Sequence, residues 1–249
     1  MTPTFYSRFG KRWFDAIAAF LGLLLLSPIL LVVAVAVRLS SPGPALFLQL
    51  RTGRFDRRFR IFKFRTMKVV PNGSGSLITA IGDARVTPLG RWLRKTKIDE
   101  LPQLFNVLAG QMSLVGPRPE VPLYTATYSG WQKRVLLVRP GITSPDIDFD
   151  EEEALASCQD KESFYLTTVL PTKLEGELAY CNQISFLGDQ RIVFRTVFNV
   201  LRRLLKTRKP FPGLPSPSPS AEGQAQAGSL LARQERNGAA SSPANSSRF

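Results

Sequence analysis

The chain has 249 residues, enough for one large domain or two small ones, and its 44% hydrophobic content suffices for a core, which excludes wholesale disorder. Its net charge of +14 predicts a polyanionic partner: nucleic acid, anionic lipid or a phosphorylated substrate. It has no histidine, which excludes histidine general bases, Ser-His-Asp triads and His-ligated metal sites. Cys158 and Cys181 lack metal-ligand spacing, so any chemistry rests on carboxylates, lysines, arginines and hydroxyl groups.

An uncharged apolar run, Ala16–Val37, lies near the N-terminus and follows Arg8, Lys11 and Arg12. As a straight helix it would reach about 33 Å, enough to cross the hydrocarbon core of a bilayer. A cleavable signal peptide is less favoured, because the run exceeds the usual apolar length and Arg38 follows it directly. The sequence therefore predicts a membrane protein.

Two topologies remain open for this run: a helix that spans the bilayer, and a re-entrant helix that enters and leaves by the same face. Ser27 and Pro28 lie at its centre, where the proline removes an N–H and frees the Leu24 carbonyl. Both flanks are basic, and the positive-inside tendency then places both ends on the cytoplasmic side. These two features favour the re-entrant form, although a proline kink is also common in spanning helices.

After the apolar run, the pattern predicts a small hairpin followed by helices. The strands are Leu46–Arg51 and Phe59–Thr66, with a polar turn at 53–58, and Lys63 and Arg65 share one face of the second strand. We expect a loop at 73–82 and helices at 88–98, 102–108, 124–138, 150–158, 161–183 (bent at Pro171) and 188–206.

The last predicted helix, 188–206, is basic and amphipathic, so it either packs on the core or docks on a membrane surface. Beyond it, 207–249 is rich in Pro, Ser and Ala and is predicted to be a disordered tail. The expected organisation is therefore a membrane segment at 1–40, a compact folded domain at 41–206 and the tail. The expected fold class is α+β and mainly helical, with one small hairpin and amphipathic helices at the membrane interface.

The stretch at 94–103, RKTKIDELPQ, holds the most informative group of charged residues. Asp99 and Glu100 come just before Pro102 and so lie at or beside a helix N-terminus, where backbone N–H groups favour anions. Arg94 and neighbouring lysines crowd the same place, which suits a site for a polyphosphate and a bridging Mg²⁺ ion. The alternative is that the two acidic residues simply suit a first helical turn.

Other cations stand out singly. Arg118 is held rigidly between Pro117 and Pro119, a mount that suits a planar donor group. Each of Lys63, Arg65, Arg85 and Arg118, taken alone, is also consistent with an ordinary solvated or salt-bridged side chain.

Several motifs in order along the chain resemble the bacterial sugar transferase family, the monotopic polyprenyl-phosphate phosphoglycosyl transferases, in their small single-domain form. Besides Ser27-Pro28 within the apolar run, they are KRWFD at 11–15, SPGPALFLQLRTG at 41–53, FRIFKFRTM at 59–67, GDARVTPLGRWLRKTKIDELPQLFNVLAGQMSLVGPRPE at 82–120, RPGIT at 139–143 and SFLGDQRIVFRTV at 185–197. Ser27-Pro28 matches the family's helix-break pair, so the resemblance favours the re-entrant topology.

The resemblance implies transfer of a sugar phosphate from a UDP-sugar to polyprenyl (undecaprenyl) phosphate, with release of UMP, as the first membrane step of a surface glycan. Its catalytic Asp-Glu dyad falls on Asp99 and Glu100, with Asp99 as the nucleophile that carries a covalent phosphosugar and as a ligand of Mg²⁺. The implied binding residues are Arg94 for phosphate, Arg118 for the nucleotide, Lys63, Arg65 and Arg85 for the anionic site, and Asp189, which would position its cations.

The implied location is the cytoplasmic face of the bacterial inner membrane, with anionic lipids as further partners and no nucleic acid. A membrane-anchored nucleic-acid-binding protein is less favoured, because the positive charge is spread over separate stretches with no recognised reading helix. An inactive scaffold of the same fold is less favoured because Asp99, Glu100, Arg94 and Arg118 are all present. Direct attack by the lipid phosphate, without a covalent intermediate, is the remaining alternative mechanism.

Overall fold

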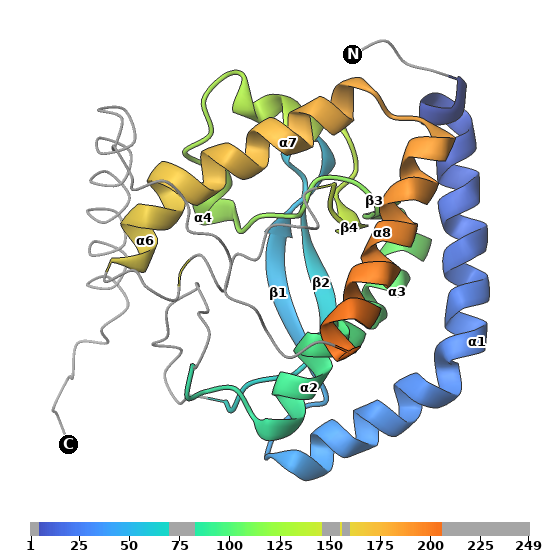
Figure 1. Ribbon diagram of the computed structural model, residues 1–249, viewed down its shortest axis with the longest axis vertical. Helices are drawn as coiled ribbons and strands as arrows, with labels where there is room; N and C mark the ends of the chain where they lie inside the picture. The colour runs from blue at the N-terminus through green and yellow to red at the C-terminus, as the bar shows by residue number, and fades with distance from the viewer. Residues whose placement is uncertain (1–4, 70–82, 146–154, 156–159, 206–249) are drawn as a thin grey trace, which may run out of the picture.

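A computed structural model places the helices around one central hairpin (Figure 1). It describes residues 5–69, 83–145, 155 and 160–205. The long N-terminal helix α1 (Lys11–Ser40) and the C-terminal helix α8 (Phe186–Leu205) lie on one side of the hairpin, and α7 (Leu170–Asn182) crosses one end of it. The described residues are mainly helical with a small antiparallel hairpin, which confirms the predicted α+β class. The predicted domain boundaries at 40 and 206 stay predictions.

A π-helical turn, η1 (Tyr6–Gly10), leads directly into α1 (Lys11–Ser40), which bends partway along its length (Figure 1). Pro28 lies inside α1, and the Ser27 hydroxyl donates a 2.9 Å hydrogen bond to the Leu24 carbonyl. This is the carbonyl that loses its helical donor to the proline. The serine thus satisfies the group that the proline leaves without its N–H.

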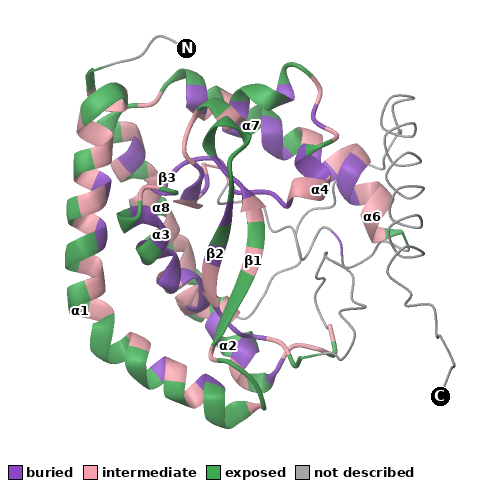
Figure 2. Ribbon diagram, turned by 180° about the vertical axis from the view of Figure 1, so that it is seen from behind, coloured by how far each residue is buried: buried purple, intermediate pink, exposed green. Residues whose placement is uncertain are grey.

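One face of α1 packs against the rest of the protein along most of its length. Asp15 and Ala19 are buried near its start, and Val33 and Val37 are buried near its end. The opposite face carries large apolar side chains that are at least half exposed, including Leu25 and Val32 (Figure 2). Helix η1–α1 is the one helix, among the described residues, long and apolar enough to cross a membrane.

The predicted hairpin is confirmed within two residues at each end. Strands β1 (Leu46–Thr52) and β2 (Arg58–Phe64) pair antiparallel around a short 3-10 turn, η2 (Arg54–Asp56). The buried Asn106 side chain clamps β2: it accepts from the Phe62 N–H and donates to the Arg60 carbonyl, at 3.0 and 2.8 Å. This clamp fixes the hairpin against the short helix at 104–108 that carries Asn106.

Helix α2 (Pro88–Thr96) confirms the helix predicted at 88–98. The Thr87 hydroxyl caps its N-terminus by accepting from the Gly90 N–H at 2.9 Å. Gly90 lies against the backbone of Thr66, where a Cβ would meet the carbonyl oxygen at 2.1 Å, so only glycine permits this approach. Lys97 ends the helix in a left-handed conformation, with φ of 59°.

The helix predicted at 102–108 begins two residues later than expected. A 3-10 helix, η4 (Ile98–Gln103), contains Pro102 and runs into the short α3 (Leu104–Leu108). Pro102 has no N–H to donate, and the segment from Ile98 has 3-10 geometry. The dyad therefore lies in the first turn of a 3-10 helix and not immediately before an α-helix.

The single helix predicted at 124–138 is wrong. The chain forms α4 (Pro122–Thr125) and a 3-10 helix, η5 (Gln132–Leu137), on either side of a bend. The Gln132 side chain accepts the Ser129 N–H at 2.7 Å, a local bond that replaces helical hydrogen bonding beside Gly130. Before and after this region, β3 (Ser113–Val115) and β4 (Gly141–Thr143) pair in parallel.

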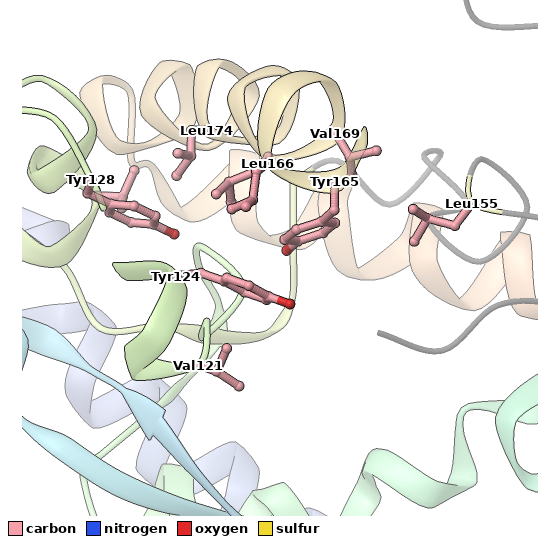
Figure 3. Packing of buried hydrophobic residues seen from close by; sticks show 10 residues of the cluster. Val121, Tyr124, Tyr128, Leu155, Tyr165, Leu166, Val169 and Leu174 are labelled. Carbon is pink, nitrogen blue, oxygen red and sulfur yellow. The ribbon is translucent and has the colours of Figure 1, made fainter. Parts of the chain in front are cut away.

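The helix predicted at 161–183 is confirmed as three consecutive segments. They are α6 (Lys161–Phe164), a π-helical turn η6 (Tyr165–Val169) and α7 (Leu170–Asn182), so the irregularity falls just before Pro171. Apolar side chains from this helical run pack on Tyr124 and Val121 in the largest buried cluster (Figure 3). Helix α8 (Phe186–Leu205) confirms the prediction at 188–206. The predicted helix at 150–158 and loop at 73–82 lie outside the described residues, apart from Leu155.

Candidate active site

Asp99 and Glu100 are both 7% exposed, although they are adjacent acidic residues. The 3-10 helix η4 holds them against strand β2, which carries Lys63. On the other side, the loop between β3 and α4 brings Arg118 to the same place. Two carboxylates are thus buried together where the hairpin, η4 and this loop meet.

Glu100 is fixed by two cations. Its Oε1 atom accepts hydrogen bonds from Lys63 Nζ at 2.9 Å and from Arg118 Nη2 at 3.1 Å. Burial alone would raise the pKa of Glu100, but the charges of Lys63 and Arg118 hold that pKa well below its usual value. Glu100 is therefore the fixed anion of the pair and orients both cations.

Asp99 is the carboxylate with a poorly stabilised charge. Its Oδ1 atom is buried and has no hydrogen-bond partner among the residues that the structure describes. Burial, and then the neighbouring charge of Glu100, raise the pKa of Asp99 to about 6, against the opposing effect of Lys63, Lys97 and Arg94. At neutral pH the side chain is mostly ionised, and a weakly solvated carboxylate of this kind suits nucleophilic attack.

Arg94 approaches from helix α2. Its Nε atom donates to the Thr66 hydroxyl at 3.0 Å, and its charge is one of those that act on Asp99. The structure therefore brings four other predicted site residues close to Asp99: Glu100, Lys63, Arg118 and Arg94.

Arg85, another predicted binding residue, is paired with an acidic neighbour. Its guanidinium group donates to both carboxylate oxygens of Asp83, at 2.6 to 3.1 Å. The Arg85 carbonyl accepts from the Lys68 N–H at 2.9 Å, which ties this segment to the chain after β2. Its assignment to the anionic site stays a prediction.

Arg65 does not share the environment of Lys63, although both were predicted on one face. It lies just past the end of β2, is 6% exposed, and its guanidinium group donates to the carbonyls of Val37, Ser41 and Pro42. Because α1 ends at Ser40, these carbonyls belong to its last turn and to the turn beyond, where helical N–H donors run out. Arg65 therefore ties the end of α1 to the hairpin, and its predicted part in the anionic site stays a prediction.

Asp189 ties the other end of α1. Its carboxylate accepts hydrogen bonds from Lys11 Nζ, at 2.5 Å, and from the hydroxyls of Tyr6 and Tyr180, at 2.7 Å each. Its partners belong to η1, α1 and α7, and include none of the cations around Asp99. Asp189 therefore joins α8 to the start of α1, and its predicted role in positioning the cations of the site stays a prediction.

Sequence reasoning missed three residues of helix α7. Lys173 and Glu177 are 4% and 2% exposed, and they contact the 115–120 loop, as Tyr180 does. Their spacing of four and three residues places them on one helical face, which is the signal that could have identified them. Without knowledge of the partner loop, that signal also fits an ordinary amphipathic helix.

The dyad offers donors of the kind that Mg²⁺ prefers. Hard cations bind oxygen, and the buried Asp99 Oδ1 atom is an oxygen without a partner in the described part of the chain. Over the same residues, no group of three or more acidic or cysteine side chains could hold a metal alone. A magnesium ion would therefore take Asp99 together with substrate phosphates and water, an arrangement typical of Mg²⁺ sites.

Residues 6–203 match the family described as bacterial sugar transferase, and the chain belongs to this family. It is 36% identical, over 81% of its length, to the UDP-N-acetylgalactosamine-undecaprenyl-phosphate N-acetylgalactosaminephosphotransferase of Aeromonas hydrophila. The chain is also 39% identical, over 77% of its length, to the UDP-glucose:undecaprenyl-phosphate glucose-1-phosphate transferase of Escherichia coli K12. It covers only 46% and 40% of these two proteins. It covers 96% of the exopolysaccharide production protein PSS of Rhizobium leguminosarum, at 36% identity over 78% of its own length.

Proposed function

We propose that this protein transfers a sugar phosphate from a UDP-sugar to a polyprenyl phosphate such as undecaprenyl phosphate, releasing UMP, as the first membrane step of a surface glycan. The observation that carries the proposal is a buried Asp99 carboxylate beside a Glu100 held by Lys63 and Arg118. The names of two relatives support it, because both describe transfer of a sugar phosphate to undecaprenyl phosphate.

The reaction proceeds in two displacements at one phosphorus. A carboxylate oxygen of Asp99 attacks the phosphorus that bears the sugar, the bond to the bridging oxygen breaks, and UMP leaves with that oxygen. The resulting acyl phosphate holds the sugar phosphate on Asp99. An oxygen of the lipid phosphate then attacks the same phosphorus, forms the diphosphate and restores the Asp99 carboxylate, so one difficult step becomes two easier ones.

The cations supply most of the electrostatic stabilisation. A UDP-sugar brings two phosphate charges beside two carboxylates, and Lys63, Arg94 and Arg118 offset this repulsion. Arg118 keeps part of its side chain accessible and is oriented by Glu100, so its guanidinium group suits the nucleotide. A bound Mg²⁺ would neutralise further diphosphate charge.

We further propose that α1 is a re-entrant helix. Its two ends are tied to the same domain, through Lys11 and Asp189 at the start and through Arg65 near Ser41 at the end. A helix that crossed the bilayer would have its ends on opposite faces, which conflicts with domain contacts along its length. The exposed apolar side chains of α8, among them Phe194 and Phe198, suit insertion into the same interface, with exposed arginines near anionic headgroups.

The re-entrant topology makes a prediction for Pro28→Ala. The substitution restores an N–H to the Leu24 carbonyl and straightens α1, so part of the population is expected to adopt a spanning topology. We expect a cysteine placed at position 2 to become partly accessible to impermeant reagents from the periplasmic side. Pro44→Ala, beyond the end of α1, is the matched control; unchanged labelling in Pro28→Ala would show that tertiary contacts, and not the proline, determine the topology.

The test of the proposed activity is UMP release by the membrane-embedded protein with Mg²⁺ and a panel of UDP-sugars, with and without undecaprenyl phosphate. We expect sustained, lipid-dependent release of UMP with one donor, which also identifies the sugar. Folded protein that releases no UMP with any donor would contradict the proposal and favour an inactive member of the family. The same membranes, assayed for transfer of labelled sugar into lipid, provide the independent product measurement.

A further inference from the structure

The backbone of the Arg118 loop has an unusual shortage of donors. Pro117 and Pro119 have no N–H, so the N–H of Arg118 is the one backbone donor of this tripeptide. That N–H donates to Glu177 Oε1 at 2.8 Å. The buried carboxyl group of Glu177, on α7, therefore accepts the one backbone N–H that this tripeptide offers.

The carbonyls on either side of Arg118 are held by other elements. The Pro117 carbonyl accepts from the Gly141 N–H at 2.8 Å, and the Pro119 carbonyl accepts from Arg51 Nη1 at 2.9 Å. Glu177 completes this set by accepting the Arg118 N–H. Without it, the peptide unit that carries the Arg118 side chain would lose the contact that fixes its N–H.

Helix α7 contacts the loop at three points. Lys173 Nζ donates to Glu120 at 3.0 Å, Glu177 binds Arg118, and the Tyr180 hydroxyl lies 3.2 Å from the Val115 carbonyl. Glu177 is the middle contact and is 2% exposed, so water does not compete for it. The α7 side chains thus reach the start, the middle and the end of the 115–120 segment.

We infer that Glu177 is a positioning residue: by fixing the Arg118 backbone, it orients the Arg118 guanidinium group toward Glu100 and the nucleotide. The inference rests on the proposed function. Its physical basis is a short path of contacts, from Glu177 to the Arg118 N–H, and from the Arg118 guanidinium group to Glu100, which adjoins Asp99. A small displacement of a substrate-orienting group weakens binding strongly, so removing the Glu177 contact should raise the KM for the UDP-sugar.

The experiment compares Glu177→Ala with Glu177→Gln in the intact membrane-embedded protein. Alanine removes the acceptor, and we expect KM for the UDP-sugar to rise about tenfold or more while kcat changes less. Glutamine retains an oxygen that can accept the Arg118 N–H, so it should restore KM to within about threefold of the wild-type value. Glu175→Ala, an exposed position on the same helix, is the matched control.

A double variant separates positioning from a general contribution to folding. If Glu177 acts through Arg118, then Glu177→Ala should cause little further rise in KM when Arg118 is already alanine. The inference is overturned if Glu177→Ala leaves KM unchanged or lowers kcat alone. It is also overturned if the effects of Glu177→Ala and Arg118→Ala on KM multiply in the double variant, or if Glu177→Gln raises KM as much as Glu177→Ala does.

The same variants distinguish this inference from the proposed function. If the wild-type protein releases no UMP with any donor, the proposed function fails, and binding of UDP becomes the readout. Glu177→Ala should then weaken UDP binding about tenfold, with glutamine close to wild type. Equal UDP affinity in all variants would overturn the positioning role.

Discussion

Asp99→Asn is expected to reduce lipid-dependent UMP release by about a thousandfold or more, because an amide cannot replace the carboxylate as nucleophile. The substitution preserves size and shape in a buried place, and the buried Oδ1 atom has no hydrogen-bond partner to lose in the described part of the chain. We therefore expect the protein to insert in the membrane and unfold at close to the wild-type temperature. Initial rates of UMP release at saturating donor and lipid measure the effect.

Asp56→Asn is the matched control for this variant. Asp56 is exposed in the hairpin turn with φ of 60°, a conformation that asparagine also adopts readily. It should retain wild-type turnover. Asp99→Asn with more than a few per cent of wild-type activity would contradict the assignment of Asp99 as the nucleophile, provided that deamidation back to aspartate is excluded by mass spectrometry.

Glu100→Gln is expected to lower turnover by about a hundredfold or more. The neutral side chain no longer balances Lys63 and Arg118, so both cations are free to pair with Asp99 and to leave the substrate phosphates. This variant tests the role of Glu100 as an orienting anion, while its shape is retained.

The pH dependence of the same variant gives a second readout. In the wild type, kcat/KM for the donor should fall as pH decreases through the pKa of Asp99, about 6, because protonation removes the nucleophile. The charge of Glu100 raises the pKa of Asp99, so its removal should shift this limb to lower pH. A limb that stays in place, or full turnover in Glu100→Gln, would contradict the proposed coupling of the two carboxylates.

The sequence predicts the long elements of this fold well, because each has a strong local pattern. The apolar helix, the alternating hairpin strands, α2 and the amphipathic α8 all appear within a few residues of their predicted bounds. The errors fall where a backbone reversal or a side-chain hydrogen bond overrides the helical pattern of the sequence. Lys97 reverses the chain before the dyad, and a Gln132 side chain interrupts the predicted helix at 124–138.

The predicted site divides in a similar way. Lys63, Arg94 and Arg118 converge on the dyad as expected, whereas Arg65 and Asp189 fasten the two ends of α1. Nothing in local sequence distinguishes a cation that binds phosphate from one that binds the carbonyls at a helix end, since both need the same donors. Glu177 was missed for a related reason: its role depends on a loop far from it in the sequence.

A single turnover with UDP-sugar in the absence of lipid tests the covalent route most directly. That route predicts release of UMP up to one equivalent per enzyme, and a sugar phosphate attached to the peptide that contains Asp99, detected by mass spectrometry. Added undecaprenyl phosphate should then discharge this adduct into lipid. UMP release that requires lipid even in the first turnover, with no adduct on Asp99, would contradict the covalent route and favour direct attack by the lipid phosphate.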